Sequence, residues 1–303
     1  MPRQRGSFSW IRKRRCNFVA FSSIMSYPTL HIFLIGDTSR PEFREAGIAL
    51  EELAHVTRFA DVEAAITSLE EGLLTAHGIV LAQAYPDQFS AVAIDRLRNL
   101  APLARWIAIL GSWCEGEPRS GHPLPGVVRM YWHQAVVRIR REFPYWFEAQ
   151  GSAWLPATAT DEERLLASIE SPLPQGKGLV AIWTGRPEME GLLSDVCRRG
   201  GYATAWLHPR QPAHVRGAVA AIFDGASLDA VGFEELKQLA TDMAPAPVLA
   251  LLDAPRIQDV RLARTLGVTV LAKPFRVDEL LWLLPRQPRQ PASSQNPSPM
   301  PSV

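Results

Sequence analysis

Short apolar runs alternate with amphipathic stretches along most of the chain, and this alternation constrains the fold more than any other feature. In the first series the apolar runs are LHIFLI, HVTRF, GIVLA, RWIAIL and, after an interruption, VVRMYW. Apolar runs of this length, bounded by Gly, Asp or Pro, are typical of buried parallel strands, and the i, i+3, i+4 spacing between them is typical of covering helices. The pattern predicts a β-α-β-α fold.

A second and cleaner series follows, with the apolar runs LVAIW, YATAWL, AVAAIF, PVLALL and VTVLA. At this size the commonest arrangement is a doubly wound sheet in the order 2-1-3-4-5. We therefore expect an α/β protein of two tandem doubly wound domains, each with a five-stranded parallel sheet of the flavodoxin-like kind.

The expected organisation has five parts. Thr160 and Glu163 form a T-x-x-E capping box, which predicts a short helix in the linker. The parts are a disordered basic tail (1–27), a first domain (28–149), a linker (150–177), a second domain (178–284) and a disordered Pro/Ser-rich tail (285–303).

Charge and cysteine content narrow the function classes. With 32 Lys+Arg against 31 Asp+Glu, nothing in the net charge favours a nucleic acid or a membrane as partner. The 3 cysteines form no C-x-x-C pair, so a reducing cytoplasm is the expected compartment. The apolar stretch before Met25 is too short for a membrane span, and Met25 is an alternative start to Met1.

Three features of the second series belong together. Asp224 closes the third apolar run, Gly232 and Glu234 follow it, and Lys273-Pro274-Phe275 closes the fifth run. This combination resembles the receiver domain of bacterial response regulators, the CheY-like family. The resemblance implies that Asp224 is the phosphoacceptor-like residue, that Lys273 contacts the phosphoryl group, and that Gly232 and Pro274 support the turns.

Two departures from the family pattern indicate a degenerate receiver. Where the family has an acidic pair for Mg²⁺, this chain has Trp183 and Thr184, so we expect weak or absent Mg²⁺ binding and no cofactor. Where the family has a Ser or Thr that acts as the switch, this chain has Leu252 and Asp253. The aspartate would repel a phosphate and could pair with Lys273 instead.

The first series departs further. Asp37 is the acid near its first strand end, its third strand ends in Ala82 and Gln83, and no K-P-F follows its last strand. Its likeness to a receiver rests on strand order and length alone, which is an analogy of fold.

The segment Gly111–Gly126 stands where a receiver has its fourth helix, and its prolines and glycines disfavour a helix. Its composition fits a partner-binding loop, and an Ω-like loop packed by its own Trp113 is the alternative. The candidate partner-binding residues in and after it are Trp113, Glu115, Arg119, Tyr131 and Trp132.

Other chemistry in this region has weaker support. Cys114, His122 and His133 match no zinc spacing, and no third group would orient a Cys–His pair, so no metal site is expected. The basic tract Arg138–Arg141 fits an amphipathic helix as well as a phosphate contact.

These observations favour a signal-transduction protein, not an enzyme, that binds signalling proteins such as sensor kinases or output proteins with little phosphotransfer. The alternatives are a working aspartyl-phosphate response regulator that uses Asp224, and a small-ligand-binding or enzymatic α/β protein with its site at the Trp113 loop.

Overall fold

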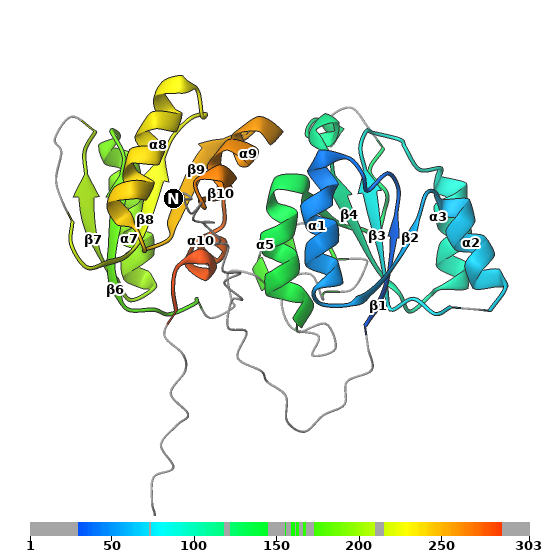
Figure 1. Cartoon of the computed structure of the whole chain (residues 1–303). Coiled ribbons are helices and arrows are strands. Elements are labelled where there is room, and N and C mark those ends of the chain that lie inside the picture. Colours follow the sequence, from blue (N-terminus) through cyan, green and yellow to red (C-terminus); the bar gives the residue numbers. More distant parts are fainter. Residues whose placement is uncertain are drawn as a thin grey trace, which may run out of the picture.

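The chain forms two α/β domains that stand side by side (Figure 1). The computed structural model describes residues 30–72, 74–117, 122–144, 155, 159–160, 162–163, 166–167, 173–209 and 215–286. The N-terminal tail and nearly all of the C-terminal tail lie outside these residues, as does most of the linker. Within the described residues no helix combines the length and the apolar character that a membrane crossing needs.

The first domain has one five-stranded parallel sheet in the order β2-β1-β3-β4-β5. The expected order 2-1-3-4-5 is therefore found. Its elements are β1 (His31–Ile35), α1 (Pro41–Glu51), β2 (His55–Phe59), α2 (Val62–Glu70), β3 (Gly78–Gln83), α3 (Ala91–Leu100), β4 (Arg105–Leu110), the 3₁₀ turn η1 (Ser112–Cys114), β5 (Val128–Tyr131) and α5 (Trp132–Glu142).

The second domain repeats this order as β7-β6-β8-β9-β10, again with all strands parallel. Its elements are β6 (Gly178–Trp183), α7 (Pro187–Arg199), β7 (Tyr202–Leu207), β8 (Ala218–Asp224), α8 (Ala230–Met243), β9 (Val248–Asp253), α9 (Ile257–Thr265), β10 (Thr269–Lys273) and α10 (Val277–Leu283).

Burial explains why the apolar runs become central strands. Every residue of β3 is buried, because helices cover both faces of a parallel sheet. Each sheet has one apolar cluster on either face. Side-chain caps fix the start of two covering helices: Asp61 accepts from Ala64 N at the start of α2, and Asp229 accepts from Gly232 N at the start of α8.

The linker capping box is also found. Thr160 N–H donates to Glu163 Oε2 at 2.7 Å, and Glu163 N–H donates to Thr160 Oγ1 at 3.2 Å. Residues 162–163 and 166–167 are helical. The T-x-x-E pattern therefore marked a real helix start.

The domains contact each other through helices at the edges of the two sheets. In Figure 1, α1 and α5 of the first domain face α9, β10 and α10 of the second. Ile257 and Val260 on α9 pack against the apolar cluster of the first domain that includes Trp132. One side of the second domain is thus covered by the first.

Candidate functional site

Asp224 lies at the carboxyl end of the second sheet, where several strands end together. It is the last residue of β8, and Lys273 is the last residue of β10. Lys273 Nζ lies 2.9 Å from Asp224 Oδ1 and donates to the Gly225 carbonyl at 2.9 Å. The sheet therefore brings this aspartate and this lysine into salt-bridge contact.

A second cation, Arg186, reaches the same carboxylate from the loop between β6 and α7. Its Nε donates to Asp224 Oδ2 at 3.0 Å, and its Nη2 donates to Oδ1 at 2.5 Å. Thr184 Oγ1 donates to Oδ2 at 2.7 Å. A guanidinium that contacts both carboxylate oxygens is among the strongest charge-assisted pairings available to side chains. Asp224 therefore has protein donors on each oxygen.

Hydrogen bonds within the β6–α7 loop and from β7 keep Arg186 in this position. Thr184 Oγ1 accepts a hydrogen bond from Arg186 N–H at 3.1 Å, and Thr184 is fully buried. Trp206 Nε1 donates to the Thr184 carbonyl at 2.9 Å. Sequence reasoning gave Arg186 no role. The signal that could have found it is a basic residue directly after a strand end that lacks its acidic pair.

The Asp224 carboxylate is enclosed and ionised. None of its side-chain surface is exposed, whereas 50% of the Arg186 side chain is. Burial raises the pKa of Asp224, but hydrogen bonds from Arg186, Thr184 and Lys273 lower it by more. The pKa therefore lies below its ordinary value. The carboxylate is thus a stable anion already neutralised by the chain's own cations.

The residues around Asp224 do not fit a magnesium ion. Mg²⁺ requires nearly octahedral oxygen ligands, usually including more than one carboxylate. Asp253 Oδ1 lies 2.7 Å from Lys273 Nζ, the pairing considered for it in the sequence, so this carboxylate is already paired with a cation. Glu188 lies in the exposed first turn of α7. The Arg186 guanidinium contacts the oxygens that a metal would need.

Gly232 has a different place from the one expected. It lies in the first turn of α8, whose N-cap is Asp229, and so it is a helix residue and not a turn residue. Its Cβ, if present, would lie 2.9 Å from the carbonyl oxygen of Ser227, which explains why glycine suits the position. Pro274 does follow the end of β10, in the loop before α10, and Leu252 is fully buried.

The matching edge of the first sheet is built from different residues. Gln83, at the end of β3, is buried, and its Nε2 donates to Glu117 Oε1 at 2.6 Å. Arg129 on β5 donates to the other oxygen of Glu117. Asp37, the acid expected near this edge, instead accepts from the Ser39 hydroxyl at 2.5 Å. The sequence pattern placed Glu117 in a surface loop, whereas the structure shows it as the buried carboxylate that contacts Gln83 and Arg129.

The Gly111–Gly126 segment begins with η1, and Glu117 after it is helical. Residues 118–121 lie outside the described part, so the absence of a helix in this segment stays a prediction. Trp113 is 75% exposed, and Glu115 is exposed as well. The next residue after Trp113, Cys114, is fully buried, and burial raises its pKa to about 11. The turn is therefore anchored by Cys114, and Trp113 projects away from the core.

The other candidate partner-binding residues lie in different environments. Arg119 lies outside the described residues. Tyr131 is partly buried and stacks on His133, with ring centroids 5.7 Å apart. Trp132 was expected on a strand and at a partner surface, and this is wrong: it is the first residue of α5 and is only 6% exposed. An apolar core position accounts for that tryptophan.

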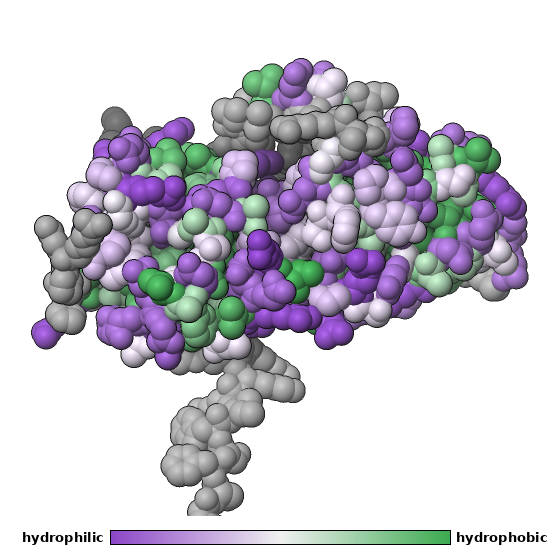
Figure 2. Space-filling view, turned by 90° about the horizontal axis from the view of Figure 1, so that it is seen from above, coloured by the Kyte–Doolittle hydropathy of each residue, from purple (hydrophilic) through white to green (hydrophobic). Residues whose placement is uncertain are grey.

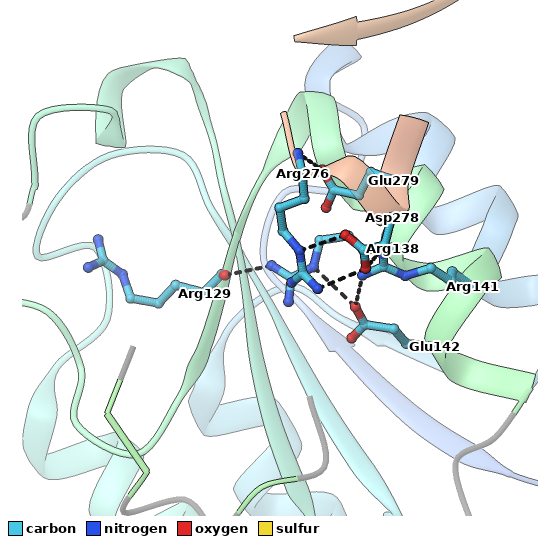
Figure 3. Close-up of polar contacts among 7 residues, drawn as sticks. All are labelled: Arg129, Arg138, Arg141, Glu142, Arg276, Asp278 and Glu279. Atoms are coloured by element: carbon cyan, nitrogen blue, oxygen red, sulfur yellow. Dashed lines mark hydrogen bonds and ion pairs between the residues drawn. The ribbon is translucent and has the colours of Figure 1, made fainter. Parts of the chain in front are cut away.

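A network of arginines and carboxylates joins the two domains between α5 and α10 (Figure 3). Arg141 Nη2 lies 2.7 Å from Glu142 Oε1, and its Nη1 lies 2.8 Å from Asp278 Oδ2 in the other domain. Arg276 donates to both oxygens of Asp278, at 3.1 and 2.9 Å. Arginines of the basic tract thus serve the domain boundary.

This network continues toward the edge of the first sheet. Arg138 Nε lies 3.4 Å from Glu142 Oε1, and its Nη1 donates to the Arg129 carbonyl at 3.1 Å. Glu142 is buried; burial raises its pKa, and Arg138 and Arg141 lower it by more, so it is an anion. Figure 3 shows these side chains converging from both domains.

No protein-family model matches the chain, and no curated protein matches it. Among solved structures, a CheY-like response regulator from Mesorhizobium loti aligns over 35% of this chain and 93% of its own, at 19% identity and a TM-score of 0.30. FixJ from B. japonicum aligns over 36% of this chain and 57% of its own, at 21% identity and a TM-score of 0.27.

A probable two-component system response regulator/GGDEF domain protein aligns over 83% of this chain and 94% of its own, at 12% identity and a TM-score of 0.30. The class of protein follows from the sheets themselves. Two five-stranded parallel sheets in the order 2-1-3-4-5, with helices on both faces, make this an α/β protein of flavodoxin-like fold.

Proposed function

We propose that this is a signal-transduction protein whose two receiver-like domains act by binding other signalling proteins, largely without phosphotransfer. The observation that carries the proposal is the closed state of Asp224. Arg186 and Thr184 contact Oδ2, and Arg186 and Lys273 contact Oδ1. An aspartate that attacks a phosphoryl donor needs a free oxygen and, beside it, a cation that can accept the incoming oxygens.

The arginine supports this reading in a second way. A guanidinium supplies positive charge without the open coordination positions by which a metal ion binds a phosphoryl oxygen. The first domain presents the amide Gln83 at the corresponding strand end, and an amide is not a phosphoacceptor. Both sheet edges therefore favour a scaffold role over phosphoryl chemistry.

A partner surface is proposed at the carboxyl edge of the first sheet. Tyr85, which follows β3, is 53% exposed, and Trp113, which follows the adjacent β4, is 75% exposed. Exposed aromatic residues are enriched where proteins bind one another. Partners in the class of sensor kinases or output proteins would meet this edge while α1 and α5 of the same domain stay docked on the second.

The test is a phosphoryl-mimic experiment on the full chain. Wild-type protein and Asp224→Asn are titrated with beryllofluoride and Mg²⁺, and bound fluoride is followed by ¹⁹F NMR. We expect no bound signal in either protein, because Arg186 remains on the carboxylate. As a matched variant, Arg186→Ala removes the guanidinium from both carboxylate oxygens, while Lys273 and Thr184 stay in contact with them, and shows whether the arginine is what blocks the site.

The opposite outcome is equally clear. A bound fluoride signal in the wild type that disappears in Asp224→Asn would show a working phosphoacceptor and would overturn the proposal. The same signal in Arg186→Ala alone would assign the block to Arg186 and support it.

A further inference from the structure

The boundary between the two domains contains a cleft of about 450 Å³. Its lining comes from the first turn of α1, from α5, from α9 and from the start of β10. Figure 1 shows that these elements of the two domains face one another. Figure 2, which looks down on the molecule, shows hydrophilic and apolar residues side by side where the domains meet. The volume falls in the range of sites that hold small organic molecules.

Basic side chains dominate the polar part of the cleft. Four arginines line it, Arg44, Arg140, Arg261 and Arg264, against two glutamates, Glu42 and Glu45. Glu45 pairs with Arg264; Glu42 lies 3.4 Å from Arg40, but its buried Oε1 has no hydrogen-bond partner among the described residues, and burial raises its pKa. With four arginines against two glutamates, the charge of the lining favours an anion.

Two of the four arginines are not engaged. Arg140 is held by Glu52 at 2.9 Å and Arg264 by Glu45. Within the described residues the guanidinium groups of Arg44 and Arg261 have no ion pair or hydrogen bond, and both residues are exposed. Arg44 comes from α1 of the first domain and Arg261 from α9 of the second, so each domain contributes one such arginine to the lining of the cleft.

The rest of the lining consists of apolar side chains and of helix amino termini, whose partial positive charge favours an anion. Val136, Val260, Val268 and Val270 line the cleft. The first turns of α1 and α5 line it too, through Pro41 and His133, and helix amino termini carry partial positive charge. Inorganic phosphate alone would leave the apolar wall unused, whereas a molecule with an apolar body would cover it.

We propose that this cleft binds a small organic anion, with an acidic head group that bridges Arg44 and Arg261 and an apolar body that lies on the valine wall. Because the site takes one arginine from each domain, the ligand binds the docked arrangement better than any separated one and stabilises it. The proposal does not depend on the state of Asp224, so the two can fail independently.

The experiment uses two matched fluorescent probes on the full chain. 1-Anilinonaphthalene-8-sulfonate carries an anionic head on an aromatic body, and N-phenyl-1-naphthylamine has the same body without the charge. We expect one saturable sulfonate site. Losing a charge-assisted contact weakens binding by about tenfold, so Arg44→Glu and Arg261→Glu should each weaken sulfonate binding by about that factor and leave the neutral probe within about twofold.

Arg198→Glu is the control, because Arg198 lies on α7, is 65% exposed and does not line the cleft. It should bind both probes as the wild type does. If a charge-reversed variant does not fold, Arg44→Gln and Arg261→Gln remove the charge more gently. Equal sulfonate affinity in the wild type and in folded Arg44 and Arg261 variants would overturn the proposal, as would the absence of any saturable binding.

Discussion

The two domains share one sheet order but neutralise the same sheet edge in opposite ways. In the second domain the strand end provides the anion, Asp224, and a loop arginine and a strand lysine reach in to it. In the first domain the strand end provides a neutral amide, Gln83, and the anion is Glu117 from the segment between β4 and β5, paired with Arg129. Strand order therefore decides which positions meet, while the residues at the strand ends and in the segments after them decide which charges meet there.

The largest effect is expected when the buried anion of the second domain is removed. Asp224→Ala should lower the free energy of unfolding by about 3 kcal/mol, because it leaves Arg186 and Lys273 without their shared carboxylate. Asp253→Ala is the matched control, because it removes the other carboxylate partner of Lys273. The Asp253 side chain is 51% exposed, so this change should lower the free energy of unfolding by less than about 1 kcal/mol. Chemical denaturation measures both, and equal losses would refute the distinction.

The same contribution should depend on pH. The pKa of folded Asp224 lies below that of an unfolded aspartate, about 3.9. Its stabilisation is therefore complete above about pH 4 and is lost as the pH falls through the folded-state pKa. The difference in unfolding free energy between wild type and Asp224→Asn, measured from pH 7 to pH 2.5, should be flat and then shrink. A difference that grows in acid would contradict the assigned charge state.

A smaller loss is expected at the edge of the first sheet. Glu117→Gln should lower the free energy of unfolding by about 2 kcal/mol, because an amide can accept from Gln83 or Arg129 but presents a donor to the other. Glu115→Gln changes an exposed residue of the same loop and should have almost no effect. If the two variants unfold alike, Glu117 is not the internal anion of this edge.

Between the domains, the pair Arg141–Asp278 should show a measurable coupling. The two side chains are 13% and 19% exposed, so solvent screens them little. A double-mutant cycle with Arg141→Met and Asp278→Asn should give a coupling energy of about 1 kcal/mol. Additive single effects would mean that the contact joins the domains in geometry but not in energy.

The smallest effect on stability is expected at Trp113. Because the side chain is 75% exposed, Trp113→Ala should change the free energy of unfolding by no more than about 0.5 kcal/mol. Recovery of a bound signalling protein in pull-downs should fall, since an aromatic anchor is worth about 2 kcal/mol or more at an interface. A folded variant that retains every partner would remove Trp113 from the proposed surface.

The fold could be predicted from the sequence because periodicity carries it. The run LHIFLI became β1 and the residues before Lys273 became β10, since buried parallel strands need apolar side chains on both faces. The place where Asp224 and Lys273 meet followed from the same reasoning, because in this sheet order strand ends converge at one edge.

The residues that the sequence analysis did not place correctly are those whose side-chain direction cannot be predicted from hydrophobic periodicity. Arg186 folds back onto Asp224, and Glu117 is buried in a segment that composition alone marks as polar. Trp132 looked like the end of a strand but begins a helix, because the chain turns after Tyr131. Such choices depend on which opposite charge or apolar wall lies near in space, and sequence neighbours do not reveal that.

The Arg141–Asp278 contact limits the modularity of the protein. Arg141 also pairs with Glu142, and Asp278 with Arg276, inside their own domains, so a domain excised at the linker would keep one partner for each charge and lose the one that crosses the boundary. The same holds for recombination: exchanging either half for another domain of equal fold would remove one of the two ion-pair partners of Arg141 or Asp278 unless the exchange also supplied the opposite charge. Although built from two copies of one architecture, the halves are joined by an ion pair as well as by the apolar packing of α9 on the first domain.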